Sequence, residues 1–212
     1  MKQFRWILVC TLLTTLSVAG NVGLNSSVRV ADGEVREDGV SAVNGKITIG
    51  DGATVGGNCQ TVNGSITVGK DSNVKDLETV NGGVDVGAGT VVEGDVAAVN
   101  GHVAMESGAR AHGVGTVNGG IELTGAEVAR DVTTVNGDIE LRDGTTVGGD
   151  IIVQDRGKHS DKRKRPLRIV LEGGSVVEGN IIVEEKDDNV EVHLEDGSRV
   201  NGRIEGAKVI EG

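Results

Sequence analysis

The stretch "TVNGDIELRDGTTVGGDI", residues 134–151, has near copies along most of the chain. Its Val-Asn-Gly core occurs six times, at steps of 18 or 19 residues. In each copy, apolar residues stand two and four positions after the Gly, which is typical of a short strand with one buried face. The same frame continues without the Asn from Ile169 and Val192, and it begins earlier at Val28, so the sequence holds nine units.

The repeat length decides between the known repeat architectures. Helical repeats need about 33 residues and propeller blades about 40, whereas a unit of about 18 residues with Gly-containing turns is typical of a parallel β-helix. The β-branched and Gly-rich composition also disfavours helices. We therefore predict an all-β fold, a single-stranded parallel β-helix over residues 28–212, with about nine rungs of about 18 residues.

The direction of winding has two interpretations. A six-residue step of apolar residues, as at Val62, Val68 and Val74, is typical of the left-handed hexapeptide helix. That form places small residues where this chain has bulky ones, so a right-handed coil is favoured. The bulky residues are Ile47, Ile66, Ile121 and Ile139.

A turn position recurs nine residues after each Val of Val-Asn-Gly. It is Gly in most units, so we expect a positive φ there, a conformation that Gly adopts freely. Asp71 takes the position in one unit, and Asp tolerates this conformation better than most residues. Ala126 takes it in another, so we expect that turn to be strained or differently shaped. The Gly residues are Gly52, Gly89, Gly108, Gly144, Gly174 and Gly197.

The Asn residues of the repeat are predicted to form a structural ladder. Equivalent residues of a stacked coil lie above one another, so Asn side chains can hydrogen-bond along the stack or satisfy backbone groups of the turns. The alternative is a polar stripe that binds a sugar or a metal. The column comprises Asn44, Asn63, Asn81, Asn100, Asn118 and Asn136.

Residues 1–19 have the pattern of an export signal, with Lys2 and Arg5 before an apolar run and small residues at Ser17 and Ala19. The apolar run is short for a membrane span, although an uncleaved anchor is the alternative. Residues 20–27 then form a polar lead. We expect an exported protein of the bacterial periplasm or cell surface, with no membrane span after cleavage.

Cleavage would change the composition. It removes both aromatic residues and leaves 19 basic and 32 acidic side chains, a net charge of −13. This charge repels nucleic acid, which is therefore not an expected partner. Cys59 remains as a single thiol, so no internal disulfide can form. Its equivalents in the other units, such as Leu77 and Val96, are apolar, which predicts that Cys59 lies in the core.

Two charged insertions interrupt the repeat and are predicted as corner loops, at residues 154–166 after Val153 and at residues 184–189 after Val183. Val153 and Val183 are equivalent, so both loops should leave the same corner. They are either solvated loops that attract each other weakly or a docking site for an anionic envelope component such as lipopolysaccharide. The basic cluster of the first loop is Lys158, Lys162, Arg163, Lys164 and Arg165.

The sequence offers little for catalysis. The four His residues lack the spacing of metal ligands, and no Ser lies in a nucleophile motif. We predict no catalytic residue, no metal and no cofactor, and hence no enzyme. A polysaccharide-acting enzyme is a distant alternative, because surface carboxylates are abundant.

Two stretches resemble bactofilins, polymer-forming bacterial cytoskeletal proteins built on a triangular β-helix. They are "TVVEGDVAAVNGHV" at residues 90–103 and "GGSVVEGNIIV" at residues 173–183. The repeated "TVNGxI" is also similar to exported β-solenoid proteins of Gram-negative bacteria, some described as adhesin-like. The likeness covers roughly residues 28–206 and implies a structural or assembling protein without catalytic residues. Most bactofilins lack a cleavable signal, which puts a cytoskeletal role in doubt.

We therefore expect an exported, non-enzymatic β-solenoid that serves as an envelope scaffold or self-assembling element, with homo-oligomers formed by end-to-end stacking. The alternative is an adhesin-like module that binds an envelope component through the charged corner loops.

Overall fold

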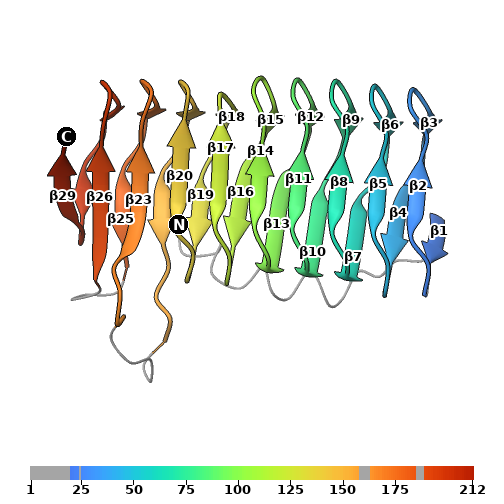
Figure 1. Cartoon of the computed structure of the whole chain (residues 1–212), viewed down its shortest axis with the longest axis horizontal. Coiled ribbons are helices and arrows are strands. Elements are labelled where there is room, and N and C mark those ends of the chain that lie inside the picture. Colours follow the sequence, from blue (N-terminus) through green and yellow to red (C-terminus); the bar gives the residue numbers. More distant parts are fainter. Residues whose placement is uncertain (1–19, 24, 158–162, 185–188) are drawn as a thin grey trace.

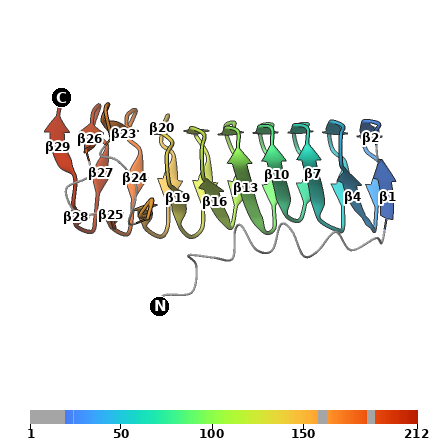
Figure 2. The same ribbon diagram turned by 90° about the horizontal axis from the view of Figure 1, so that it is seen from below.

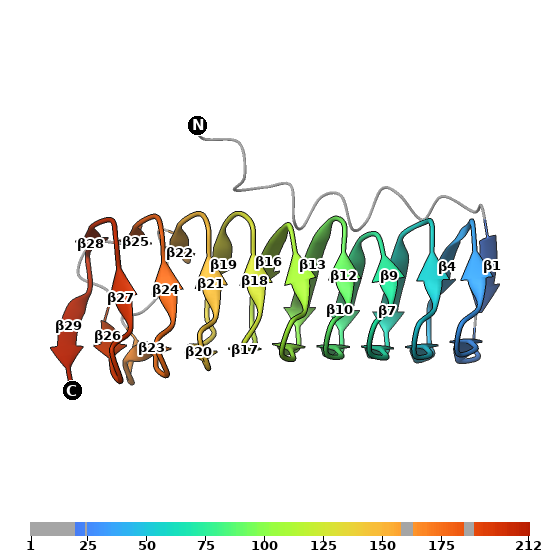
Figure 3. The same ribbon diagram turned by 90° about the horizontal axis from the view of Figure 1, so that it is seen from above.

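The computed structural model describes residues 20–23, 25–157, 163–184 and 189–212, and these contain 29 β-strands and no helix. The strands form a rod of stacked coils (Figure 1). Each strand pairs in parallel with its equivalents one coil away. Figure 2 shows the same rod from below, and Figure 3 shows it from above.

Three sheets make up the coil. Sheet A contains β1 (Gly20–Gly23), β4 (Gly39–Ala42), β7 (Cys59–Asn63), β10 (Leu77–Asn81), β13 (Asp95–Asn100), β16 (Gly113–Thr116), β19 (Val132–Thr134), β22 (Ile151–Val153), β25 (Ile181–Val183) and β28 (Ile204–Glu205). Sheet B contains β2 (Val28–Val30), β5 (Ile47–Ile49), β8 (Ile66–Val68), β11 (Val84–Val86), β14 (Val103–Met105), β17 (Ile121–Thr124), β20 (Ile139–Arg142), β23 (Leu167–Leu171), β26 (Val190–Leu194) and β29 (Lys208–Glu211). Sheet C contains β3 (Val35–Arg36), β6 (Thr54–Val55), β9 (Asn73–Val74), β12 (Val91–Val92), β15 (Arg110–Ala111), β18 (Glu127–Val128), β21 (Thr146–Val147), β24 (Val176–Val177) and β27 (Arg199–Val200).

Nine complete coils run from β2 to β28, with β1 before them and β29 after them. The predicted parallel β-helix of nine units is confirmed, and its handedness stays a prediction. The described coil begins earlier than expected, because β1 lies inside the predicted lead at residues 20–27 and pairs with β4. The predicted signal, residues 1–19, lies outside the described residues.

The register of the sheets follows the sequence repeat. Asn81 is the partner of Asn63 on one side and of Asn100 on the other, and Ile47 is the partner of Ile66. The strands of sheet B from β2 to β26 therefore place the same two apolar positions of the repeat on the side of the core. The core is a continuous stack of Val, Ile, Leu and Ala side chains that are almost wholly buried.

The recurrent turn position has the expected backbone. All six predicted Gly residues have positive φ, and Asp71 has a φ of 54°. The unit with Ala126 is differently shaped: the positive φ falls on Gly125, and the turn is one residue shorter than in the next coil. Ala126 is thereby freed from the left-handed conformation and is buried in the core.

Val153 and Val183 are register partners, so the two insertions leave the same corner of the coil, as predicted. Residues 158–162 and 185–188, which include Lys158 and Lys162, lie outside the described residues. Within the described part of the chain, no helix has the length and apolar character needed to cross a membrane.

Candidate functional site: the asparagine ladder and the basic corner

The Asn side chains form one hydrogen-bonded column along the rod. Each Nδ2 donates to the Oδ1 of the Asn one coil earlier, over distances of 2.8 to 3.0 Å. The column begins one coil earlier than the repeat motif indicates, because Asn44 Nδ2 donates to Oδ1 of Asn25 at 2.8 Å. Asn25 lacks the Val-Asn-Gly frame, and its 19-residue distance from Asn44 was the only signal that the sequence offered.

The ladder runs along the outside of the coil. All six Asn residues of the repeat are exposed, and their amides bond one another instead of buried turn groups. Each amide therefore keeps one donor hydrogen and one acceptor lone pair that face solvent. The ladder is a regular polar stripe on the surface as well as a structural element.

Buried Thr side chains bond the turn backbone in place of the Asn residues. Thr61 Oγ1 donates to the carbonyl of Gly45 at 3.0 Å, and Thr79 Oγ1 donates to that of Gly64 at 2.8 Å. Sequence reasoning missed this column, although Thr stands two residues before the Asn in four of the six copies. The four residues are Thr61, Thr79, Thr116 and Thr134.

A second polar column lies at the corner between sheets C and A. The carboxylate of Asp131 accepts the backbone N–H of Asp150 at 2.8 Å, and Asp150 accepts that of Asn180 at 2.6 Å. Asn180 in turn accepts the backbone N–H of Arg203 at 2.9 Å. These side chains accept hydrogen bonds from backbone N–H groups one coil away. Asp131 and Asp150 thus help to join successive coils.

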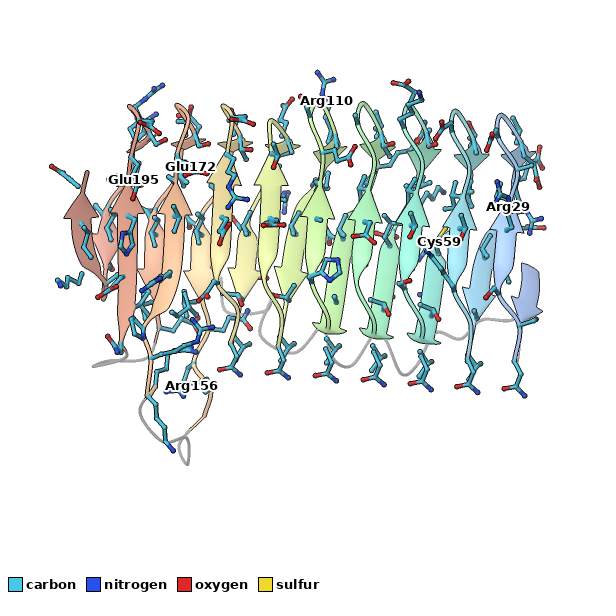
Figure 4. All side chains as sticks on the ribbon, viewed as in Figure 1. Arg29, Cys59, Arg110, Arg156, Glu172 and Glu195 are labelled. Atoms are coloured by element: carbon cyan, nitrogen blue, oxygen red, sulfur yellow. The ribbon has the colours of Figure 1, made fainter. Side chains whose placement is uncertain are left out.

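The basic corner lies where the ladder ends. Arg163 donates from Nη1 to Oδ1 of Asn136 at 3.1 Å and from Nη2 to the carbonyl oxygen of Val135 at 2.6 Å. A guanidinium thus occupies the acceptor end of the amide chain, where positive charge is favourable. The loop also carries Arg156, which lies outside the body of the rod (Figure 4).

The neighbouring residues form an open hollow of about 220 Å³. Arg165 Nη1 lies 2.9 Å from Oδ2 of Asp138, whose other oxygen accepts the backbone N–H of Arg168 at 3.0 Å. Lys164 is exposed at the rim. Three described cations face one carboxylate here, so the hollow is basic on an otherwise acidic molecule. Its lining is Asn136, Asp138, Arg163, Lys164, Arg165, Pro166 and Leu167.

Carboxylates also gather around Arg142 at the other end of the sheet B strands. Arg142 forms ion pairs with Glu122 at 3.1 Å, with Glu172 at 2.6 Å, and with Glu140. The hydrogen bonds to Glu172 and then Glu122 raise the pKa of Arg142 above its ordinary value. These acidic groups are held as acceptors around one cation.

Among the carboxyl groups of the described residues, Glu78 has a raised pKa. Partial burial on strand β10 raises the pKa of Glu78, and the hydrogen bond from Nε2 of Gln60 at 2.9 Å opposes that effect. A raised pKa is what a general acid requires, but the partner of Glu78 is an amide and not a second carboxylate.

The described His residues lie apart from one another. His102 pairs with Asp85 at 2.9 Å, and His112 lies 3.4 Å from Asp95. Among the described residues, no three His, Cys, Asp or Glu side chains are placed to hold a metal ion.

Cys59 lies in the core, as predicted. It is fully buried between its register partners Val40 and Leu77 in sheet A. Burial raises the pKa of the thiol to about 12. Cys59 is thus a small apolar side chain of the core at neutral pH.

Comparison of the chain with protein-family models, with curated proteins and with solved structures found no match. The fold and the contacts above therefore carry the functional argument, and the resemblance to bactofilins and to adhesin-like proteins stays a prediction.

Proposed function

We propose that this protein is an exported, non-enzymatic structural β-solenoid that acts as an envelope scaffold or self-associating element. The observation that carries the proposal is the uninterrupted stack of three parallel sheets. Within the described residues, the terminal strands of each sheet have one neighbour only, so both ends of the coil offer backbone groups for pairing. Unpaired strand edges are templates for association with another chain.

The interior supports a mechanical role. Successive coils are joined by backbone hydrogen bonds in all three sheets, and the apolar core continues from the first coil to the last. Such a quasi-one-dimensional stack is stabilised by contacts between neighbouring units. A bactofilin-like assembly through the ends and a place in the bacterial envelope are parts of this proposal. The export pattern of residues 1–19 supports the location.

Fractionation of cells tests the location and the self-association together. Full-length protein and a variant without residues 1–19 would be expressed in a Gram-negative host, and cross-linked before fractionation. We expect the full-length chain in the envelope or periplasmic fraction as cross-linked homo-oligomers, and the shortened variant in the cytoplasm. Recovery of the full-length chain as a cytoplasmic monomer would contradict the proposal.

The basic hollow favours a second candidate function, an adhesin-like module that binds an anionic envelope component. Arg163 and Arg165 have partners within the protein, so the exposed Lys164 is, among the three described cations of the hollow, the one most open to a ligand. A phosphate-rich polymer would meet positive charge here and negative charge over most of the remaining surface.

Binding to purified lipopolysaccharide tests this candidate. Lys164→Glu should weaken binding, with Lys46→Glu as the control, because Lys46 is also exposed but lies near the opposite end of the rod. Equal binding by both variants and the wild type would exclude the corner as the site.

A further inference from the structure

Gly follows every repeat Asn of the ladder, and the stacking of the coils requires it. A Cβ at Gly64 would clash with the carbonyl oxygen of Gly45 in the coil before, and a Cβ at Gly82 would clash with that of Gly64. The same clash recurs in later coils, at Gly101, Gly119 and Gly137. Only Gly allows two backbones to approach so closely. The ladder is therefore also a column of six Asn–Gly pairs.

Asn is a chemically labile side chain, and Gly after it makes deamidation easy because no side chain shields the attacking nitrogen. The backbone nitrogen of Gly attacks Cγ of Asn, its proton passes to Nδ2, the Cγ–Nδ2 bond breaks and ammonia leaves. Water then opens the succinimide at either of its two carbonyl groups and gives Asp or isoaspartate. Both products have a carboxylate, which at neutral pH accepts hydrogen bonds and donates none.

The ladder holds the groups that must meet in this reaction. Asn81 donates from Nδ2 to Asn63 at 2.8 Å and accepts at Oδ1 from Asn100 at 3.0 Å. Moving Cγ of Asn81 onto the following nitrogen breaks both bonds. In the last pair of the column the nitrogen itself is engaged, because the N–H of Gly137 donates to Oγ1 of Thr134 at 2.9 Å. Exposed Asn–Gly pairs are thus kept from the reactive geometry.

We propose that the ladder suppresses deamidation of its own Asn–Gly pairs, and that these pairs are latent modification sites whose reaction, once begun, advances toward the N-terminal end of the rod. Neither the location of the protein nor its self-association enters this chemistry. The ladder acts on the side chains that form it.

The direction follows from the order of donors and acceptors. Asn118 donates to Asn100, and Asn100 donates to Asn81. A carboxylate at position 100 still accepts from Asn118, but it cannot donate to Asn81 and places negative charge against Oδ1 of that residue. Modification at one coil therefore releases the Asn one coil earlier and leaves the Asn one coil later held.

The pair Asn201–Gly202 lies outside the ladder and provides an internal reference. Asn201 donates from Nδ2 to Oε2 of Glu178 at 2.7 Å, and the N–H of Gly202 donates to the carbonyl oxygen of Gly179 at 3.0 Å. Neither contact involves a ladder side chain. The conversion of Asn201 therefore reports general opening of the protein and not the state of the ladder.

Peptide mapping by mass spectrometry tests the proposal. Purified protein is incubated at pH 8, and Asp and isoaspartate are quantified over time at each of these Asn residues. In the wild type, the six ladder pairs should convert more slowly in the folded protein than in the same chain unfolded in denaturant. Equal rates in the two states would overturn the protection.

Two variants test the direction. In Asn100→Asp, Asn81 should convert about 2- to 10-fold faster than in the wild type, the factor for one lost hydrogen bond, and Asn118 should be unchanged. In Asn100→Ala, both should convert faster, because Asn118 also loses its acceptor. Asn73→Ala removes an exposed Asn outside the ladder and should change none of these rates.

Circular dichroism establishes that the variants are folded, and Asn118→Asp repeats the test one coil later, with Asn100 released and Asn136 held. Equal acceleration on both sides of the Asp substitution would overturn the direction. Acceleration of every pair, Asn201 included, would show that general opening controls the reaction and would overturn the role of the ladder.

Discussion

Arg163 and Asn136 are 27 residues apart in the sequence, but the Arg163 guanidinium donates to Oδ1 of Asn136 at 3.1 Å and closes the acceptor end of the Asn ladder. Every amide of the ladder donates toward the N-terminal end of the rod. Within the described residues, no further Asn of the ladder therefore donates a hydrogen bond to Oδ1 of Asn136, the last Asn of the column. The Arg supplies that donor. The same side chain attaches the basic loop to the coil through the carbonyl of Val135.

Replacing Arg163 with Ala should therefore detach the loop from Val135 and remove the hydrogen-bond donor to Oδ1 of Asn136 at the end of the ladder. Hydrogen bonds to charged groups contribute about 1.5–3 kcal/mol, and exposure reduces this, so we expect a loss of about 1 kcal/mol in the free energy of unfolding. Urea titration measures it. Lys164→Ala removes an adjacent exposed cation and should change the stability little; an equal loss in both variants would mean that charge, not the cap, is responsible.

Replacing Asn100 with Ala interrupts the ladder at its middle. The variant loses the bond to Asn81 and the bond from Asn118. Because both bonds are exposed, we expect a loss of about 0.5–1.5 kcal/mol, the range for ordinary hydrogen bonds. Asn73→Ala removes an exposed Asn of sheet C that lies outside the ladder, and it should cost less in the same denaturant titration. Equal costs would show that the ladder adds nothing to stability.

Replacing Thr79 with Val should lower the free energy of unfolding more than Asn100→Ala does. The Thr79 side chain is fully buried and bonds the carbonyl oxygen of Gly64. An unpaired buried acceptor costs about 1–3 kcal/mol. Thr48→Val, at an outward position of sheet B, is the control and should be nearly neutral in thermal unfolding. A smaller loss for Thr79→Val than for Asn100→Ala would reverse this ranking of the two columns.

The sequence predicts the coil well because one pattern is repeated in every unit. The apolar alternation after Val-Asn-Gly fixes the inward positions of sheet B, and the Gly positions fix the turns. The ends escape prediction because they lack the pattern. The strand Val35–Arg36 has two residues, and hydrophobicity alone would place Val35 inside, whereas the register with Thr54 and Val55 places Arg36 there.

The site is less predictable than the coil for a related reason. The Asn column follows from the repeat, but its exposure depends on the adjacent Thr, which takes over the buried turn groups. The docking of Arg163 depends on a contact between a loop and a coil formed earlier in the chain. A local pattern of charges at residues 154–166 contains no information about that contact.

The last prediction concerns the pH dependence of stability at Cys59. Burial raises the pKa of the thiol from its ordinary value of 9.0 to about 12. Between these values the unfolded chain loses the thiol proton while the folded chain keeps it, so the unfolded state is favoured progressively as the pH rises. The stabilising effect of the protonated thiol is therefore complete below pH 9 and is lost between pH 9 and about 12.

We expect the free energy of unfolding to fall more steeply from pH 9 upward in the wild type than in Cys59→Ala, which has no group to titrate. Urea titrations of both proteins at pH 8, 9.5 and 10.5 measure the difference, because other titrating groups contribute equally to both. Thiol labelling at pH 8 should also be slow in native protein and fast in denaturant, since the reactive thiolate is scarce and enclosed. Rapid labelling of folded protein, or parallel pH profiles for the two proteins, would show that Cys59 is open to solvent and that the column containing Val40 and Leu77 does not enclose it.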